Sequence, residues 1–408
     1  MFLMLSLMAN AAGPKPVKVR TLISEAKAAI KYSKNQQNAE KNLLAVVDRE
    51  DVTTEQRAEI YFMASELERN INDAENMKLY LKQAYDTVKF FNTILNMHEH
   101  LIKCDSYDCE PNAAGVVKLK YRNKSREILK AYRTNLLNGG KFMLKHAKYN
   151  EAYPYFDMYL QSSRHAILES EPAFRTDSLL PRVAYWATVS AYNANQPEKA
   201  LKYIDEAIEG GNESLRTSLQ EYKARCYEVL KNNEKWMEAL EEGTRLYPAH
   251  DYFFLKLMDE YMDEQEYDKG LALCDTLISK VGNKDIYWFA ESQIFLLRKQ
   301  FDETIRTADE ALKCDSTMTD AYYNKGNAFL NKAVIFAETA CNDVRDPKCR
   351  EDRRQLQNLY NQAREPMEMV RRLAPKDSKR WAMPLYRIYL NLNMGNEFAE
   401  MEKILNDQ

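Results

Sequence analysis

Apolar residues between positions 251 and 329 recur at the spacing of an α-helix. Phe254, Leu257, Met258 and Tyr261 would lie on one face of a helix. A polar break follows, and a second helical run of apolar residues begins at Leu271. The pattern predicts a helix, a turn and a second helix, and then the same arrangement again.

Large apolar residues in this stretch also recur with a longer, fixed period. A period of this length is typical of proteins built from stacked repeats. We expect the aromatic residues in these positions, such as Trp288, to be buried between successive repeats. The period is 34 residues (288 − 254, 322 − 288, 295 − 261 and 329 − 295), as seen in Phe254, Trp288 and Tyr322 and in Tyr261, Phe295 and Phe329.

These positions resemble the tetratricopeptide repeat (TPR) signature, which runs aromatic-x2-Leu-Gly-x2-Tyr and then Ala-x3-Phe and Pro. The second half departs from the signature, because Gly270-x3-Cys274 and Thr304-x3-Ala308 lack the Phe. The resemblance implies an all-α fold, namely a right-handed superhelical solenoid of antiparallel helix pairs. Three copies of the first half carry it: Phe254-x2-Leu257-Met258-x2-Tyr261, Trp288-x2-Glu291-Ser292-x2-Phe295 and Tyr322-x2-Lys325-Gly326-x2-Phe329.

The weaker patterns outside this stretch suggest three regions. Residues 1–12 resemble a signal peptide, and residues 17–135 resemble an N-terminal helical region of diverged TPR-like pairs. Residues 136–408 are predicted to form a TPR-like solenoid with an insert at about 336–360. Gly139 and Gly140 are expected to start its first clear unit, whose second helix contains Ala152-x3-Phe156.

The first residues resemble a secretory leader. An apolar run at residues 2–8 precedes Ala9-Asn10-Ala11, which fits a signal-peptidase site. No Lys or Arg precedes the run, so the leader could be truncated, and the rival interpretation is an apolar start of a cytosolic chain. The run is too short to cross a bilayer. Together with residues 381–405, the leader resembles exported TPR proteins of Gram-negative envelopes, which implies a periplasmic or outer-envelope location.

Two pairs of the seven cysteines lie close together in the sequence. In an exported protein we expect Cys104 with Cys109, and Cys341 with Cys349, to form disulfides. For the first pair a metal site that includes His100 and a pair of free thiols remain as alternatives, and no metal site is predicted.

Composition and charge narrow the class of protein further. The 408 residues include only 11 Gly and 12 Pro, which favours a helical chain, and the net charge is −3. No overall field therefore draws the protein to nucleic acid. A basic run could form an RNA-binding patch, but we favour a solvated helix face that pairs with acidic helices, and predict no nucleic-acid partner. The run contains Lys118, Lys120, Arg122, Lys124, Arg126, Lys130 and Arg133.

The sequence offers no recognisable catalytic motif. It has no Gly-rich phosphate loop, no HExxH, no Cys-x2-Cys pair and no nucleophile elbow, and its five histidines are scattered. We therefore predict a protein that is not an enzyme and needs no cofactor.

The TPR resemblance implies a binding surface instead, because the first helix of each pair lines the concave side of such a solenoid. Asn and Gln there can donate and accept hydrogen bonds to an extended peptide, and Tyr and Phe supply rigid apolar contacts. The predicted partner is a protein or peptide, with an oligomeric state that the sequence does not indicate. The alternative is a small-ligand or glycan-binding helical-repeat protein of nutrient uptake, favoured by the aromatic content. The candidate groove residues are Tyr252, Leu255, Asp259, Met262, Phe289, Gln293, Tyr323, Asn327 and Asn331.

Overall fold

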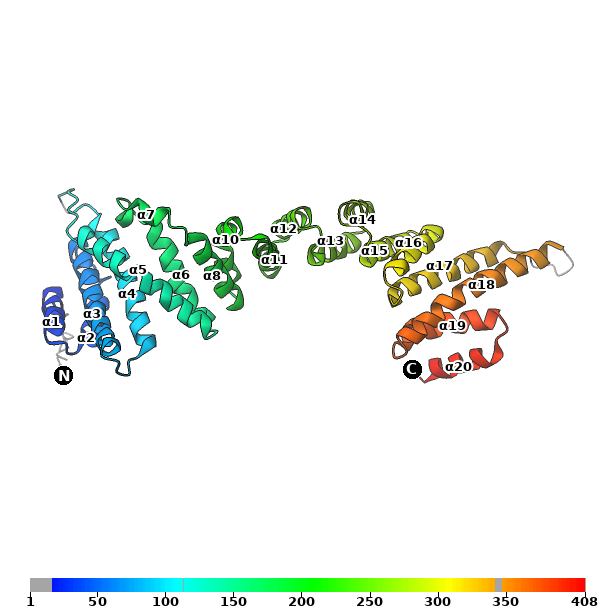
Figure 1. Ribbon diagram of the computed structural model, residues 1–408, viewed down its shortest axis with the longest axis horizontal. Helices are drawn as coiled ribbons and strands as arrows, with labels where there is room; N and C mark the ends of the chain where they lie inside the picture. Colours follow the sequence, from blue (N-terminus) through cyan, green and yellow to red (C-terminus); the bar gives the residue numbers. More distant parts are fainter. Residues whose placement is uncertain (1–16, 113, 342–346, 408) are drawn as a thin grey trace, which may run out of the picture. The chain divides into compact units, whose positions relative to one another are not determined.

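The computed structural model describes residues 17–112, 114–341 and 347–407, so the predicted signal peptide lies outside the described residues. The described part of the chain forms α-helices and one short 3-10 helix, with no strand (Figure 1). Consecutive helices pack against each other as antiparallel pairs. The predicted all-α fold of helix pairs is therefore confirmed.

The chain divides into two compact units, Met1–Asn233 and Glu234–Gln408. The expected boundary between residues 135 and 136 instead falls inside a helix, α5. The first unit contains α1 (Val19–Tyr32), α2 (Gln36–Leu44), α3 (Thr54–Tyr80), α4 (Thr87–Asp108), α5 (Arg122–Lys145), α6 (Tyr149–Arg164), η1 (Ala166–Leu168), α7 (Pro172–Arg175), α8 (Leu180–Asn193), α9 (Pro197–Leu201), α10 (Ile204–Gly210) and α11 (Glu213–Val229).

The second unit is the more regular of the two, and α17 and α18 are its longest helices. It is formed by α12 (Asn233–Leu246), α13 (Asp251–Asp263), α14 (Tyr267–Val281), α15 (Asp285–Leu297), α16 (Phe301–Cys314), α17 (Thr319–Thr339), α18 (Pro347–Leu373), α19 (Ser378–Asn391) and α20 (Gly395–Asn406).

The 34-residue period reappears in the helix boundaries of the second unit. First helices begin at Asp251, Asp285 and Thr319 (285 − 251 and 319 − 285 are both 34). Second helices keep the same step, starting at Asn233, Tyr267 and Phe301 (267 − 233 and 301 − 267). The turn inside each pair repeats too, with a left-handed residue at Lys231, Gln265 and Lys299. These boundaries show a TPR-like repeat in the predicted register.

The aromatic residue that packs most deeply is one position earlier than expected. Tyr287 is fully buried, whereas Trp288 is only partly buried. The Tyr287 ring meets Phe254 of α13 edge-on, with centroids 4.8 Å apart. Phe253, 34 residues before Tyr287, is equally buried against Gly243 of α12. The contact between successive helix pairs therefore uses both positions.

Gly139 and Gly140 do not start a unit, as the sequence suggested, but lie in the middle of α5. A Cβ added to Gly140 would be 2.6 Å from Phe156 Cε1, and one added to Gly139 would be 2.7 Å from Tyr155 Cε1. The two glycines thus let the aromatic rings of α6 approach the backbone of α5. What reads as a helix break in the sequence is a close packing contact.

The expected disulfide between Cys104 and Cys109 is wrong, since both thiols are free. The expected loop is helical up to Asp108, and residues five apart on a helix point about 140° away from each other. Cys104 is buried in the core, while Cys109 lies beside the Arg122 guanidinium. Cys341 and Cys349, in contrast, are joined by a disulfide where the long helices α17 and α18 approach each other.

No described helix combines the length and the apolar character needed to cross a membrane.

Replacing Gly140 with Ala tests the α5–α6 contact. The added methyl group meets the Phe156 ring, so overpacking should outweigh the better helix propensity of Ala, with a net loss of roughly 1–2 kcal/mol of unfolding free energy. Gly395→Ala in α20 is the control, because its Cβ would meet nothing within 4 Å. Urea unfolding followed by circular dichroism measures both, and equal midpoints for the two variants would contradict the packing account.

Candidate functional site

Helices α13, α15 and α17 are the first helices of consecutive pairs, and side-chain contacts link them in series. Lys284, which precedes α15, forms an ion pair with Asp251 of α13, with Nζ and Oδ1 2.6 Å apart. Asn324 of α17 donates a hydrogen bond from Nδ2 to Ser292 Oγ of α15 at 2.9 Å. With the Phe254–Tyr287 ring contact, these links fix how the three helices follow one another.

The candidate groove residues all lie on these three helices, and none of them is buried. Their spacing of three or four residues places them on one side of each helix. Neighbours on the other side, such as Phe254, Leu257 and Ile294, belong to the core. The residues that remain accessible are Leu255, Asp259, Gln293 and Asn331, which are exposed, and Tyr252, Met262, Phe289, Tyr323 and Asn327, which are partly buried. We call this set the first-helix face.

Large apolar side chains are exposed along this face. Leu255 of α13 retains 47% of its accessible surface, and Leu297, which extends the face by one turn beyond Gln293 on α15, retains 53%. Met262 and Phe289 add partly buried apolar surface. Single exposed apolar residues are normal, but here they share a face with Gln293 and Asn327, whose amides can pair with a peptide backbone.

The α13 end of the face is acidic. Asp259, Asp263 and Glu264 are exposed, and none of them forms an ion pair with another described residue. Burial, and then the charges of Asp263, Glu264 and Asp259, raise the pKa of the nearby Glu260 carboxyl. The C-terminal end of the helix dipole adds further negative potential. This end of the face therefore attracts a cation.

A cation that the sequence analysis did not identify lies at the other end of the face. The guanidinium carbon of Arg380, from α19, lies 4.5 Å from the Tyr323 ring centroid. The same guanidinium forms an ion pair with Asp320 at 2.6 Å. The 34-residue period could not locate Arg380, because the long helices α17 and α18 interrupt it. The signal available in the sequence was Trp381, which occupies the aromatic position of the last helix pair.

The basic run of α5 is largely engaged inside the first unit. Arg122 binds Asp105 through two nitrogens, each 2.8 Å from a carboxylate oxygen. Arg126 donates to the carbonyl of Ile167, Lys130 pairs with Glu171, and buried Arg133 pairs with Asp177. These contacts hold η1 and α7 against α5. They support the interpretation of a paired helix face over that of an RNA-binding patch, with partners on α4 and beside α7.

Glu291 is a buried carboxyl on α15, behind the first-helix face. It occupies the repeat position of Leu257 (291 − 257 is 34) and is only 4% exposed. Burial first, and then the charge of Asp275, raise its pKa to about 7. The carboxyl is therefore a destabilising feature at neutral pH, in the middle of the helix row that carries the candidate site.

Replacing Glu291 with Leu should remove a pH dependence of stability. In the wild type the carboxyl is protonated in both states below pH 4.5, and as pH rises to about 7 the unfolded state ionises first, so stability falls. Near pH 8 the Leu variant should be more stable by roughly 2–3 kcal/mol, with little difference near pH 4. Urea unfolding across this range measures the effect.

Glu338→Gln, at an exposed position, is the control and should follow the wild type. If the unfolding free energy of Glu291→Leu depends on pH in the same way as that of the wild type, ionisation of the buried Glu291 carboxyl does not destabilise the fold.

Comparison with solved structures finds TPR proteins. A TPR repeats protein from Bacteroides fragilis is 19% identical; the match covers 62% of this chain and 96% of that chain, with a TM-score of 0.29. The C-terminal part of a TPR repeat-containing protein from Cytophaga hutchinsonii is 10% identical, with coverages of 64% and 97% and a TM-score of 0.36. The P58(IPK) TPR domain is 13% identical, with coverages of 95% and 99% and a TM-score of 0.29.

At these identities and TM-scores the three structures carry no argument about what this chain binds. The chain matches no protein-family model and no curated protein. The case for function therefore depends on the helices and side chains described above.

Proposed function

We propose that this chain is a non-enzymatic TPR scaffold that binds an extended segment of a partner protein along the first-helix face. One observation carries the proposal: three consecutive first helices present apolar, amide and acidic side chains that no described part of the second unit buries. In a helix-pair repeat, this is the row of residues that packing leaves free.

The chemistry of the face favours a particular kind of segment. Leu255 and Leu297 would contact apolar side chains, while Gln293 and Asn327 would bind the peptide backbone. Asp259 and its acidic neighbours favour a Lys or Arg near the α13 end. We therefore expect an extended peptide that carries both apolar and basic residues.

We further propose that the protein works in the cell envelope of a Gram-negative bacterium. The leader-like pattern at residues 2–11 supports export. The disulfide between Cys341 and Cys349 fits an oxidising compartment. Cell fractionation together with mass spectrometry of the mature N-terminus tests this location, which is wrong if the intact chain stays in the cytoplasm.

A cleft beside the long helices favours the second candidate function, binding of a small ligand. Its volume is about 610 Å³. Phe301, Ile335 and Phe336 supply apolar surface, Lys299 adds a cation to the lining, and Lys332 forms an ion pair with Asp302 there. A thermal-shift screen of carbohydrates and metabolites tests this alternative, and a flat response across the screen would count against it.

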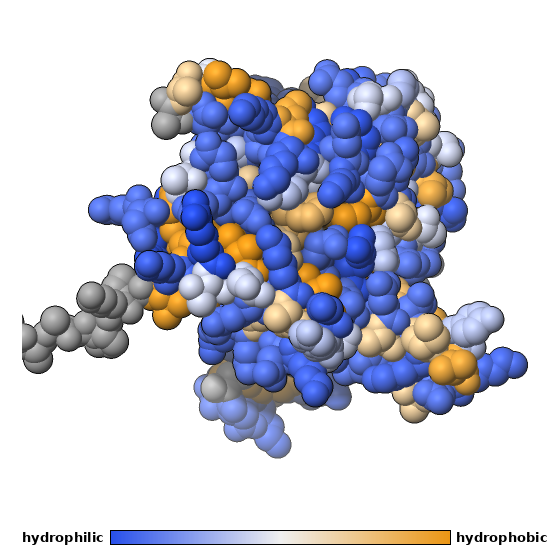
Figure 2. Space-filling view, turned by 90° about the vertical axis from the view of Figure 1, so that its left-hand side faces the viewer, coloured by the Kyte–Doolittle hydropathy of each residue, from blue (hydrophilic) through white to orange (hydrophobic). Residues whose placement is uncertain are grey.

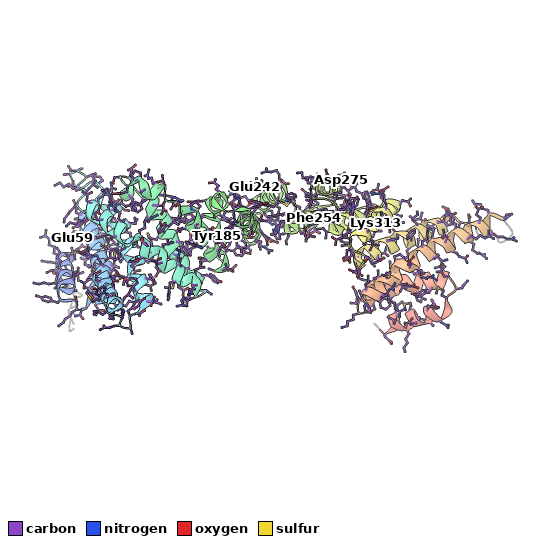
Figure 3. The ribbon with its side chains drawn as sticks, in the orientation of Figure 1. Glu59, Tyr185, Glu242, Phe254, Asp275 and Lys313 are labelled. Carbon is purple, nitrogen blue, oxygen red and sulfur yellow. A yellow bond between two sulfur atoms is a disulfide. The ribbon has the colours of Figure 1, made fainter. Side chains whose placement is uncertain are left out.

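A double variant tests the first-helix face directly. Tyr323→Ala with Asn327→Ala removes one aromatic ring and one amide from α17, so capture of the partner by chemical crosslinking in the envelope fraction should fall at least about tenfold. Asp275→Ala with Lys313→Ala, on the second helices α14 and α16, is the control and should capture as much as the wild type (Figure 3).

Equal capture by the wild type and the Tyr323/Asn327 variant would move the binding site off this face. A variant that replaces Asp259 and Asp263 with Asn isolates the charge contribution: it should weaken capture at low salt and lose that effect at high salt, since exposed charges are screened.

A further inference from the structure

Three metal-binding side chains from three helices converge inside the first unit. Glu40 comes from α2, Glu68 from α3 and His100 from α4, and one ligand atom of each lies within 4.8 Å of the others. His100 Nε2 is 2.9 Å from Glu40 Oε1. Close packing of α2 on α3 and of α3 on α4 brings them together.

The cluster is almost enclosed by protein. Glu68 is 4% exposed and His100 is 8% exposed, while the Glu40 side chain keeps 13% of its surface. Among the described residues, neither carboxylate forms an ion pair with a Lys or Arg. A buried carboxyl at Glu68 beside the partly buried Glu40 carboxylate is costly to ionise, because the His100 imidazole is the one basic group in contact with the pair among the described residues.

The other polar side chains on α4 near this cluster are held by contacts of their own. They are therefore not part of the proposed site, which also differs from the metal site considered around Cys104. Asn96 donates from Nδ2 to Glu68 Oε1 at 2.8 Å and so orients that carboxylate. His98 is turned away, with Nδ1 2.8 Å from the Ile94 carbonyl oxygen. Asp108 accepts hydrogen bonds from backbone N–H groups at the start of α5, including that of Tyr121 at 2.8 Å.

We propose that Glu40, Glu68 and His100 form a binding site for one divalent transition-metal cation, with Zn²⁺ as the cation that best matches the ligands. One imidazole nitrogen and two carboxylate oxygens suit Zn²⁺, and two negative charges balance its charge. Bonds of about 2.1 Å place the ligand atoms of a tetrahedral site roughly 3.4 Å apart. Small side-chain rotations are therefore enough to close the present arrangement around an ion.

An ion can reach this site from solvent, and its binding would link three helices. Glu40 is the ligand nearest to solvent, so an ion can enter from its side, and water can fill the fourth position as in other sites with three protein ligands. The surface seen from this N-terminal end of the chain is largely hydrophilic, with scattered apolar patches (Figure 2). A bound ion would fasten α2 to α3 and α4.

The rival occupant of the cluster is a proton shared between the carboxyls. Burial, and then the charge of Glu40, raise the pKa of Glu68 to about 8. The two occupants can be told apart by substituting Glu68, because a proton needs only hydrogen bonds at this position whereas a metal ion needs a carboxylate. Gln at this position can still accept the hydrogen bond from Asn96 and donate one to Glu40, which satisfies the proton-bound arrangement but supplies a poor metal ligand.

Equilibrium dialysis of the full chain against ZnCl₂, with the Cys341–Cys349 disulfide intact, together with thermal unfolding, tests the proposal. We expect the wild type to bind one equivalent of Zn²⁺ and to gain at least about 2 °C in its unfolding midpoint in excess Zn²⁺. Glu68→Gln and His100→Gln should lose both the equivalent and the shift. His146→Gln, which removes an exposed histidine, is the control and should behave as the wild type.

The Glu68→Gln variant is expected to fold, and to be at least as stable as the metal-free wild type, because Gln keeps the hydrogen bonds of the protonated carboxyl and cannot ionise in this buried place; circular dichroism checks this. Binding of Zn²⁺ by folded Glu68→Gln at the wild-type level would overturn the proposal, as would a wild type that binds none. Substituting Co²⁺ identifies the ligands, and a sulfur-to-cobalt charge-transfer band would assign the ion to free cysteines and also overturn it.

Discussion

A helix pair of this kind cannot bury its whole apolar surface by itself, so each pair depends on the next. In the second unit this dependence is visible in the contact of Phe253 with the backbone of Gly243, and in the ring contact between Phe254 and Tyr287. Between α15 and α17, the next two first helices, the contact includes the Asn324–Ser292 hydrogen bond. Because each contact must meet its counterpart in the next pair, the helix boundaries are held to a strict 34-residue step.

The same constraint explains why the candidate site lies where it does. Residues that face the neighbouring pair must be apolar or small, and the first helix is left with one side that packing does not use. At one repeat position on this side, α13, α15 and α17 carry Asp259, Gln293 and Asn327, so the chemistry changes from a carboxylate to an amide between the first repeat and the next two. Such variation is what a surface needs to recognise one segment of peptide, since identical repeats would bind in several registers.

Sequence reasoning succeeded where the signal is local and periodic, and failed where it depends on contacts between distant residues. The helix starts at Asp251, Asp285 and Thr319 follow from the period itself. Gly140 was misread because its partner, Phe156, lies in another helix. The Cys104–Cys109 pairing failed because it assumed a loop where α4 continues.

The candidate site shows the same division. The members of the first-helix face were predicted from the repeat register, and the structure leaves all of them accessible, but whether they bind a partner stays a prediction. Arg380 escaped notice because the insertion between α17 and α19 breaks the register. In the first unit, Glu40 and His100 are 60 residues apart with no period between them, so only the packed helices reveal that they meet.

The position of the Glu40, Glu68 and His100 cluster is related to the low intrinsic stability of α2. A helix of nine residues is marginal on its own and must be held by tertiary contacts. Ala39 and Leu43 supply the apolar part of that contact, since both are buried. Glu40, the residue between them in the helix turn, is directed at His100 rather than at solvent. An ion bound by Glu40, Glu68 and His100, as proposed above, would add a link between α2 and the two helices that follow it.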